Sequence, residues 1–195
     1  TIMAVNCLIY WGSSALTAGR YHFDFTMAFD REVPLLPVFV WFYILAFPFW
    51  AVGYLLAARR GKDMFYRFVA TDLTIHFICF ICFILIPTTN IRPEIPGNTL
   101  SEKILALVYS LDGGNSPSNL FPSIHCYVSW MCWKGVEGSE KVPKWYQRFS
   151  LVFAILIIIS TQVLKQHYIV DAAAALLLVE FFWRFYQKGQ RHKWV

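Results

Sequence analysis

The segment VPLLPVFVWFYILAFPFWAVGYLLAA, residues 33–58, decides the fold class, because none of its side chains is charged. A helix needs about 20 apolar residues to cross the hydrocarbon core of a bilayer, and this segment is long enough. The charged turn 59–63, Arg-Arg-Gly-Lys-Asp, ends it abruptly. We therefore predict a membrane-spanning helix over these residues.

Five other segments of the chain have a similar apolar character on either side of this helix. They are residues 1–19, 64–87, 121–136, 149–164 and 167–187. The segments 121–136 and 149–164 are short for a span, and a longer polar loop, 88–120, precedes the first of them. The pattern predicts an all-α fold: a polytopic membrane bundle of six transmembrane helices, forming a single integral membrane domain over residues 1–195.

The composition supports a membrane protein over other classes. Hydrophobic residues make up 57% of the chain and charged residues only 15%, whereas soluble domains have about 25% charged residues. The net charge of +5 would suggest nucleic acid as a partner of a soluble chain. Here the basic residues lie between apolar segments, so they indicate membrane orientation and no nucleic-acid partner.

The distribution of Lys and Arg predicts which way the bundle faces. If the N-terminus is cytoplasmic, most of the 17 Lys and Arg residues lie on the inner side, as the positive-inside rule requires. This orientation makes both termini cytoplasmic. It places residues 20–32, the 88–120 loop and the turn near 165 together on the outer face.

The outer face gathers the residues with catalytic potential. His167 and Asp171 are four residues apart, so on a helix they share a face. The carboxylate can then orient the imidazole and leave its other nitrogen free as a nucleophile. A structural His–Asp pair is the alternative interpretation of this spacing.

A second group of residues lies at the predicted start of the 121–136 helix. Pro122 suits a first turn, and the free N–H groups of a helix start attract phosphate. Ser123 adds a hydroxyl donor, and His125 can act as an acid in the same place. Arg92 and Lys165 would contribute positive charge to this outer site. Together these groups describe a phosphoryl-transfer site that needs no metal and no cofactor.

Three motifs resemble the signatures of the type-2 phosphatidic acid phosphatase superfamily. They are Arg92-Pro93, Pro122-Ser123-Ile124-His125 and the segment from Ser160 to His167 and Asp171. The resemblance implies a six-helix bundle with His167 as nucleophile, His125 as general acid and Asp171 as the orienting carboxylate. It also implies that Arg92 and Ser123 contact the phosphate.

The chain departs from the family signatures at three positions. A Lys of the first signature is replaced by Leu85, a Gly of the second by Ile124, and an Arg of the third by Thr161. Lys165 could supply one of the two missing cations of the phosphate-binding site. Lys103 or Arg20 could supply the other.

We therefore expect a metal-independent membrane phosphatase that hydrolyses a lipid phosphate monoester or diphosphate through a phosphohistidine. Its partners would be the lipid substrate and the bilayer. We expect a bacterial cytoplasmic membrane, while the oligomeric state and the N-terminal processing stay open. One alternative is a lipid headgroup phosphotransferase resembling inositol phosphorylceramide or sphingomyelin synthases. A second alternative is a non-catalytic membrane scaffold.

Two further motifs in the apolar segment 64–87 have structural interpretations. Asp72 and His76 are four residues apart, and we expect them to pair with each other because isolated charges are costly in a membrane. Cys79 and Cys82 form a CxxC motif without a second ligand pair, and we expect them to be packing residues.

Overall fold

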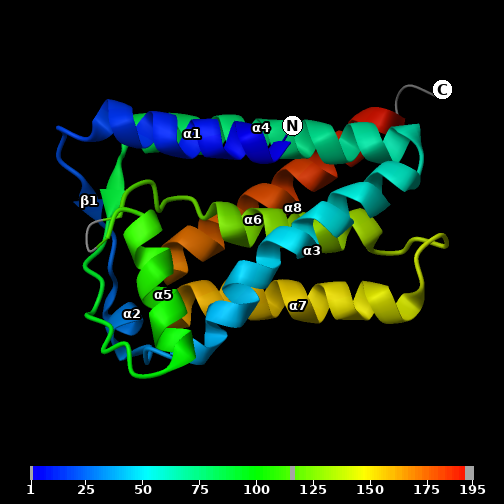
Figure 1. Ribbon diagram of the computed structural model, residues 1–195. Coiled ribbons are helices and arrows are strands. Elements are labelled where there is room, and N and C mark those ends of the chain that lie inside the picture. Colours follow the sequence, from blue (N-terminus) through cyan, green and yellow to red (C-terminus); the bar gives the residue numbers. More distant parts are fainter. Residues whose placement is uncertain (1, 115–116, 192–195) are drawn as a thin grey trace.

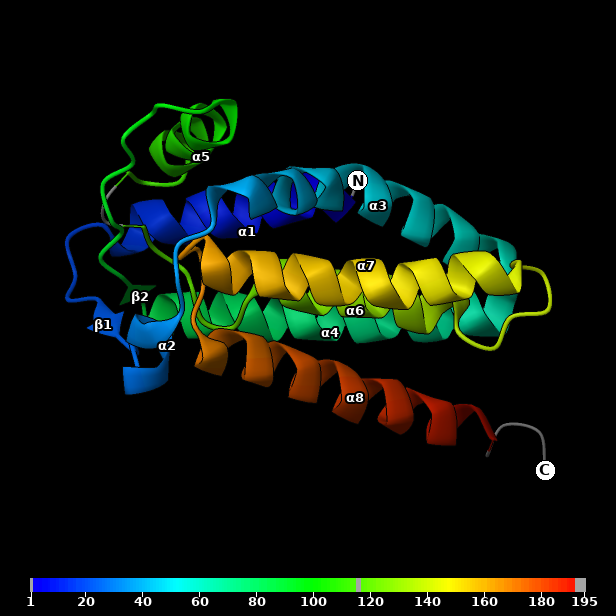
Figure 2. The same cartoon turned by 90° about the horizontal axis from the view of Figure 1, so that it is seen from below.

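The chain folds into an elongated helical bundle (Figures 1 and 2). The structure, a computed structural model, describes residues 2–114 and 117–191, and the side chains of 9–114 and 117–187. The helices are α1 (Ile2–Thr17), α2 (Ala28–Glu32), α3 (Val40–Arg59), α4 (Lys62–Leu85), α5 (Leu100–Leu111), α6 (Ile124–Val136), α7 (Lys144–Val163) and α8 (Ile169–Arg191). A 3-10 turn, η1 (Pro37–Phe39), precedes α3, and two short strands, β1 (Phe23–Asp24) and β2 (Thr88–Thr89), pair in parallel.

Helix α6 is the centre of the bundle. It contacts α3, α4, α7 and α8, and its residues Tyr127, Val128 and Met131 are fully buried. Helix α1 packs along α4 on one side of the molecule (Figure 1). Because α6 is surrounded by other helices, eight of its 13 residues are buried.

Each of the six predicted spans contains a helix, but the prediction of six membrane crossings is not supported. Among the described residues, three helical segments are long and apolar enough to cross a membrane: 37–59, 62–85 and 144–163. Helices α1 and α6 have 16 and 13 residues, short for about 30 Å of hydrocarbon. Helix α8 is long enough but carries Asp171, Glu180 and Arg184. The sequence pattern located the helices, and three of them in the described part of the chain are long and apolar enough to be spans.

Two glycines allow α3 and α4 to approach α6 closely. A Cβ atom on Gly53 of α3 would lie 2.5 Å from the Cys132 Sγ of α6. A Cβ on Gly135 of α6 would lie 2.8 Å from the Phe68 ring of α4. Small residues at such contacts are common in membrane bundles, where helices associate by close packing.

The two ends of the bundle differ. At one end, α2, α5 and the β1–β2 pair form a cap of short elements (Figures 1 and 2). Buried residues Val40, Tyr43, Leu105, Tyr109 and Leu164 join α5 to α3 and to the end of α7. The other end consists of the α3–α4 turn, the α6–α7 loop and the last turns of α8.

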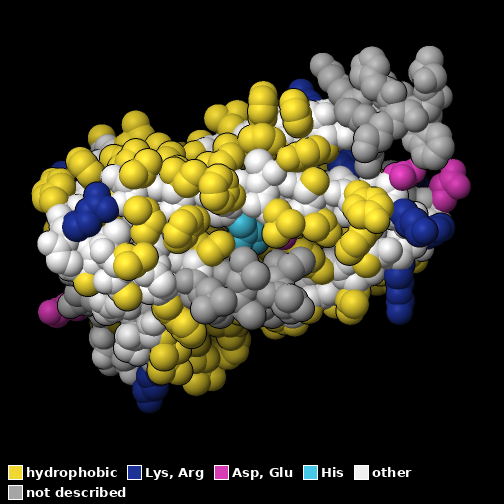
Figure 3. Space-filling model, turned by 90° about the horizontal axis from the view of Figure 1, so that it is seen from above, with side chains coloured by type: hydrophobic (Ala, Val, Ile, Leu, Met, Phe, Trp, Pro, Cys, Tyr) yellow, Lys and Arg dark blue, Asp and Glu magenta, His cyan; other side chains and the backbone are white. Residues whose placement is uncertain are grey.

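The surface between the ends is largely hydrophobic on the face shown in Figure 3, with charged side chains mostly toward the ends. Several apolar side chains of the spanning helices are more than half exposed, among them Leu55, Leu73 and Phe77. An exposed apolar band between charged ends suits a bilayer. The three apolar helices therefore indicate association with a membrane.

Candidate active site

His167 and Asp171 lie where the chain passes from α7 to α8. The His167 Nδ1 atom is 3.4 Å from the Asp171 Oδ2 atom, and both side chains are nearly buried. The same carboxylate oxygen accepts the backbone N–H of Tyr168 at 2.9 Å. Since 3.4 Å is longer than an ordinary hydrogen bond, the carboxylate is held mainly by the start of α8. It faces Nδ1, which leaves Nε2 as the nitrogen available to a substrate.

The backbone before His167 is folded tightly against the end of α7. The N–H groups of Gln166 and His167 both donate to the Thr161 carbonyl, at 2.9 and 3.0 Å. Lys165 has a φ of 53°, a left-handed backbone conformation that residues other than Gly rarely adopt. This turn presents His167 toward α6.

His125 in the first turn of α6 lies close to His167. The centroids of the two imidazole rings are 6.2 Å apart, so one phosphoryl group can contact both rings. His125 stacks on Tyr43 of α3 at 4.2 Å between centroids and also contacts Phe47 and Trp50. Its Nε2 is buried without a hydrogen-bond partner, so the aromatic rings of α3 fix the imidazole while this nitrogen stays available.

Ser123 connects the two histidines through the backbone. It is the N-cap residue of α6: its Oγ accepts the Cys126 N–H at 3.3 Å, which satisfies a donor left free at a helix start. Its own N–H donates to the Asp171 carbonyl at 3.3 Å. The start of α6 is therefore joined directly to the start of α8, and the Ser123 hydroxyl hydrogen can still be donated.

Arg92 is buried beside this pair of helix starts. One of its terminal nitrogens donates to the carbonyls of Asp112 and Gly114, at 3.0 and 3.1 Å. The other contacts the Asp112 carboxylate and the Gln166 side-chain carbonyl. The guanidinium also lies 4.6 Å from the centre of the Tyr109 ring. Gln166 therefore ties the guanidinium to the residue before His167.

Buried donors without acceptors gather around these residues. Arg92 Nε, Gln166 Nε2 and His125 Nε2 have no hydrogen-bond partner, and neither has His167 Nδ1. Leaving a buried donor unpaired costs about 1–3 kcal/mol, so a cluster of them in one place is unusual. A phosphate oxygen is an acceptor that such donors can share.

The Lys165 side chain has other partners than the unpaired donors around His125 and His167. Its ammonium group donates to the backbone carbonyls of Asp30 and Val33, in the segment that leads into α3. Burial lowers the pKa of the Lys165 ammonium below its usual value. Contact between Lys165 and a phosphate stays a prediction.

The positions where the chain departs from the family signatures lie in different surroundings. Leu85 is 64% exposed on the surface, whereas Thr161 is fully buried and lies 3.5 Å from Cys126 Sγ. Lys103 is exposed on α5, and Arg20 contacts the Ile84 carbonyl at the end of α4. None of these contacts tests which residue replaces the missing cations.

Three residues that support the site were not singled out in the sequence. Asp30 of α2 is buried and accepts the Ile169 N–H at 2.9 Å, so it caps the start of α8. Gln166 and Asp112 hold Arg92. A carboxylate within the aromatic segment 20–32 was a visible signal for Asp30, whereas nothing local marks Asp112 as the partner of Arg92.

A comparison with known families assigns the chain to one of them. A family model described as PAP2 superfamily matches residues 19–183. The chain belongs to the PAP2 superfamily. The match covers most of this PAP2 chain, including all three motifs, and it indicates phosphatase-type activity. No curated protein and no solved structure matches the chain.

The PAP2 chain also contains a second buried histidine–aspartate pair, away from the site. His76 Nδ1 lies 3.3 Å from Asp72 Oδ1 within α4, which confirms the predicted pairing. The Tyr54 hydroxyl donates to the same Asp72 oxygen at 2.8 Å, and the Tyr127 hydroxyl contacts the His76 ring. These residues connect α3, α4 and α6 inside the bundle.

Proposed function

We propose that the protein is a membrane phosphatase that hydrolyses a lipid phosphate monoester or diphosphate through a phosphohistidine on His167. The observation that carries the proposal is the meeting of two imidazoles, 6.2 Å apart, with unpaired buried donors of Arg92 and Gln166. Nucleophile, acid and anion-binding groups thus occur together, as phosphoryl transfer requires.

In the first step, His167 Nε2 attacks phosphorus. An N–P bond forms as the P–O bond to the leaving group breaks, and protonated His125 gives its proton to the departing oxygen. Asp171 faces Nδ1 and stabilises the positive charge that develops on the His167 ring. The short separation that an attack requires can be reached on binding, because catalytic contacts are often long without substrate.

In the second step, His125 accepts a proton from water. The water oxygen forms a bond to phosphorus as the N–P bond breaks, which releases phosphate and restores neutral His167. Arg92, Ser123 and the first N–H groups of α6 would hold the equatorial oxygens in both steps. Because an imidazole nucleophile replaces an activated water in the first step, the scheme is metal-independent.

The position of the site suggests the substrate class. It lies at the end of the bundle capped by α2 and α5, next to the ends of the apolar spanning helices (Figure 2). A lipid whose chains remain in the bilayer would bring its head group to this level. By the positive-inside rule, this is the outer face of the membrane.

The decisive experiment is phosphate release by purified protein in detergent with EDTA. A panel of lipid monophosphates and diphosphates is compared with the His167→Asn variant. We expect EDTA-resistant release that the variant lacks, at least about 10³-fold above it. Equal release by the wild type and the variant would disprove the nucleophile.

The same assay separates the two alternatives. A transferase would release little phosphate until an acceptor alcohol is added, and then would form a new lipid that retains phosphorus. A non-catalytic scaffold would do neither with any donor. If transfer to the alcohol depends on His167, the covalent intermediate is retained and the alcohol takes the place of water as acceptor.

A further inference from the structure

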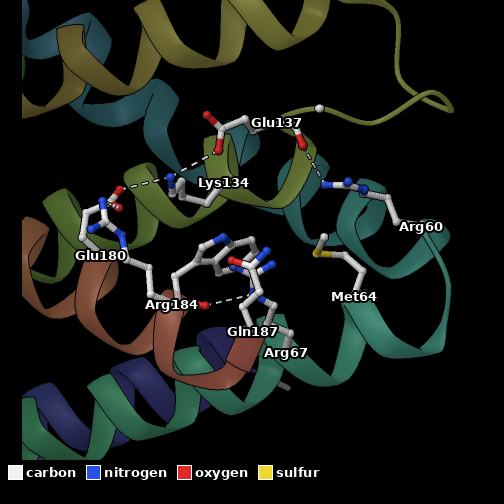
Figure 4. Close-up of a pocket in the computed structure, with 10 residues that line it drawn as sticks. Arg60, Met64, Arg67, Lys134, Glu137, Glu180, Arg184 and Gln187 are labelled. Atoms are coloured by element: carbon white, nitrogen blue, oxygen red, sulfur yellow. Dashed lines mark hydrogen bonds and ion pairs between the residues drawn. The ribbon is translucent and has the colours of Figure 1, made fainter. Parts of the chain in front are cut away.

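A cavity of about 460 Å³ lies at the end of the bundle opposite the two histidines. It is bordered by the α3–α4 turn, α4, the end of α6 and the last turns of α8 (Figure 4). His125 and Lys134 are nine residues apart on α6, which corresponds to about 14 Å along the helix. The cavity is therefore separate from the proposed active site.

The lining of the cavity is strongly basic. Four cationic side chains and two carboxylates border it, and the cations therefore outnumber the anions: Arg60, Arg67, Lys134, Arg184, Glu137 and Glu180. The volume lies within the range of small-molecule pockets, about 300–1,000 Å³.

Lys134 and Arg184 are paired with the two carboxylates. The Lys134 ammonium lies 3.2 Å from Glu137 Oε2 and 3.1 Å from Glu180 Oε1, as Figure 4 shows. Arg184 lies 3.4 Å from Glu180 Oε2. These contacts balance the charges on one side of the cavity.

Arg60 and Arg67 have neutral partners instead. Arg60 donates to the backbone carbonyls of Gly135 and Glu137, at 2.9 and 3.1 Å. Arg67 donates to the Trp183 carbonyl at 2.9 Å and to the Gln187 side chain at 3.2 Å. Their hydrogen bonds are to neutral oxygens, and the Glu137 carboxylate acts on both charges only from a longer distance.

Burying the Arg67 charge in this position costs free energy. It is 8% exposed, in an apolar helix long enough to span a membrane, and its guanidinium lies 4.1 Å from the centre of the Trp183 ring. A buried positive charge near the end of such a helix generally serves a ligand or a pairing. The Arg60 charge acts repulsively on it and the Glu137 carboxylate attractively, and a bound anion would add to that attraction.

We propose that this cavity binds a phosphate group, carried either by an anionic phospholipid head group in the adjacent leaflet or by a soluble phosphate ester. Basic pockets between helix ends at a membrane surface bind anionic head groups by such contacts. Arginine also suits phosphate because its planar donors match two oxygens at once. The proposal does not depend on the phosphatase activity, since no residue of the cavity belongs to the catalytic site.

The test is native mass spectrometry of the full chain in neutral detergent, in a His167→Asn background that prevents turnover of the probe. The probes are dioleoylphosphatidylglycerol and, as a zwitterionic control, dioleoylphosphatidylcholine. We expect retention of phosphatidylglycerol that weakens about tenfold in Arg60→Gln, because a charged hydrogen-bond donor is lost. The matched control is Arg59→Gln, which removes the same charge from an exposed neighbour outside the cavity and should retain the lipid.

Two results would overturn the proposal. One is unchanged retention in Arg60→Gln, and the other is an equal loss in Arg59→Gln, which would indicate a general basic surface. Arg67→Gln adds a second variant, and the half-buried Arg60 decides the question if that variant misfolds. Glycerol 3-phosphate separates the sources: displacement of the lipid at millimolar concentration indicates recognition of the phosphate ester alone, and persistence of the lipid indicates that its chains contribute.

Discussion

At the scale of single residues, Asp171 serves two partners with one carboxylate oxygen. Its Oδ2 accepts the Tyr168 N–H at 2.9 Å and faces His167 Nδ1 at 3.4 Å. The first contact begins α8, and the second orients the imidazole. An aspartate at this position thus links the start of a helix to the placement of the proposed nucleophile.

We predict that Asp171→Asn separates these two roles. Asparagine retains an oxygen that can accept the Tyr168 N–H, so α8 should still begin at the same residue. It lacks the negative charge that stabilises the His167 imidazolium, so kcat should fall about 10²- to 10⁴-fold. Steady-state kinetics and a thermal melt check the prediction, and an active variant or a collapsed melting temperature would contradict it.

The role of Lys165 needs a pair of variants, because the residue combines a positive φ with a partly buried ammonium group. Lys165→Ala removes the ammonium and keeps the strain of about 1–2 kcal/mol that a left-handed residue bears. Lys165→Gly removes both the ammonium and the strain. If Lys165 contacts the substrate phosphate, KM should rise about tenfold in both variants.

Full activity of Lys165→Gly would contradict that contact. The ammonium bonds to Asp30 and Val33 would then also not be needed to place His167, and only the left-handed conformation at 165 would matter. Michaelis–Menten measurements on the two variants and the wild type distinguish these results.

At the scale of helices, the contact between α3 and α6 positions the general acid. His125 is held by rings of Tyr43, Phe47 and Trp50 on α3, and Gly53 lies further along the same helix. Any shift of α3 away from α6 would therefore loosen the stacking on His125.

We predict that Gly53→Ala lowers both stability and activity. Its Cβ would lie 2.5 and 2.7 Å from two side-chain atoms of Cys132, so a helix must move, at a cost of about 1–3 kcal/mol. The matched control is Gly12→Ala on α1, whose Cβ meets nothing within 4 Å. Thermal unfolding in detergent should show a lower melting temperature for Gly53→Ala alone, and equal melting temperatures would contradict the packing argument.

Sequence patterns located the helices better than their relation to the membrane. Apolar segments predicted α3, α4 and α7, and the His167–Asp171 spacing predicted a pairing that the structure places at the start of α8, with His167 in the turn before the helix. Hydrophobicity cannot tell a helix in lipid from one packed among other helices, so the apolar pattern of the short α6 predicts a helix and not its relation to the bilayer. Asp30 and Asp112 were missed because their partners, Ile169 and Arg92, are distant in the sequence.

At the scale of the whole molecule, the two ends carry different chemistry. The end with the histidines is capped by short elements, and the opposite end carries the basic cavity (Figures 2 and 4). From the positive-inside rule we expect the histidine end to lie outside the cytoplasm. This orientation is a consequence of charge that can be tested without an activity assay.

We predict opposite labelling of cysteines placed at the two ends. In a variant without native cysteines, a membrane-impermeant maleimide should label Lys103→Cys in intact cells. Lys141→Cys, which is also exposed but lies in the α6–α7 loop, should be labelled only after permeabilisation. The reverse pattern would place the histidines on the cytoplasmic side.

The most direct test of the account is rapid-quench labelling of the purified protein with a ³²P-labelled lipid phosphate. We expect a transient phosphoenzyme that is stable in base and labile in acid, with the label on the peptide that contains His167. His167→Asn should form none. Turnover without this label, or with the label on another residue, would contradict a phosphohistidine mechanism at this site.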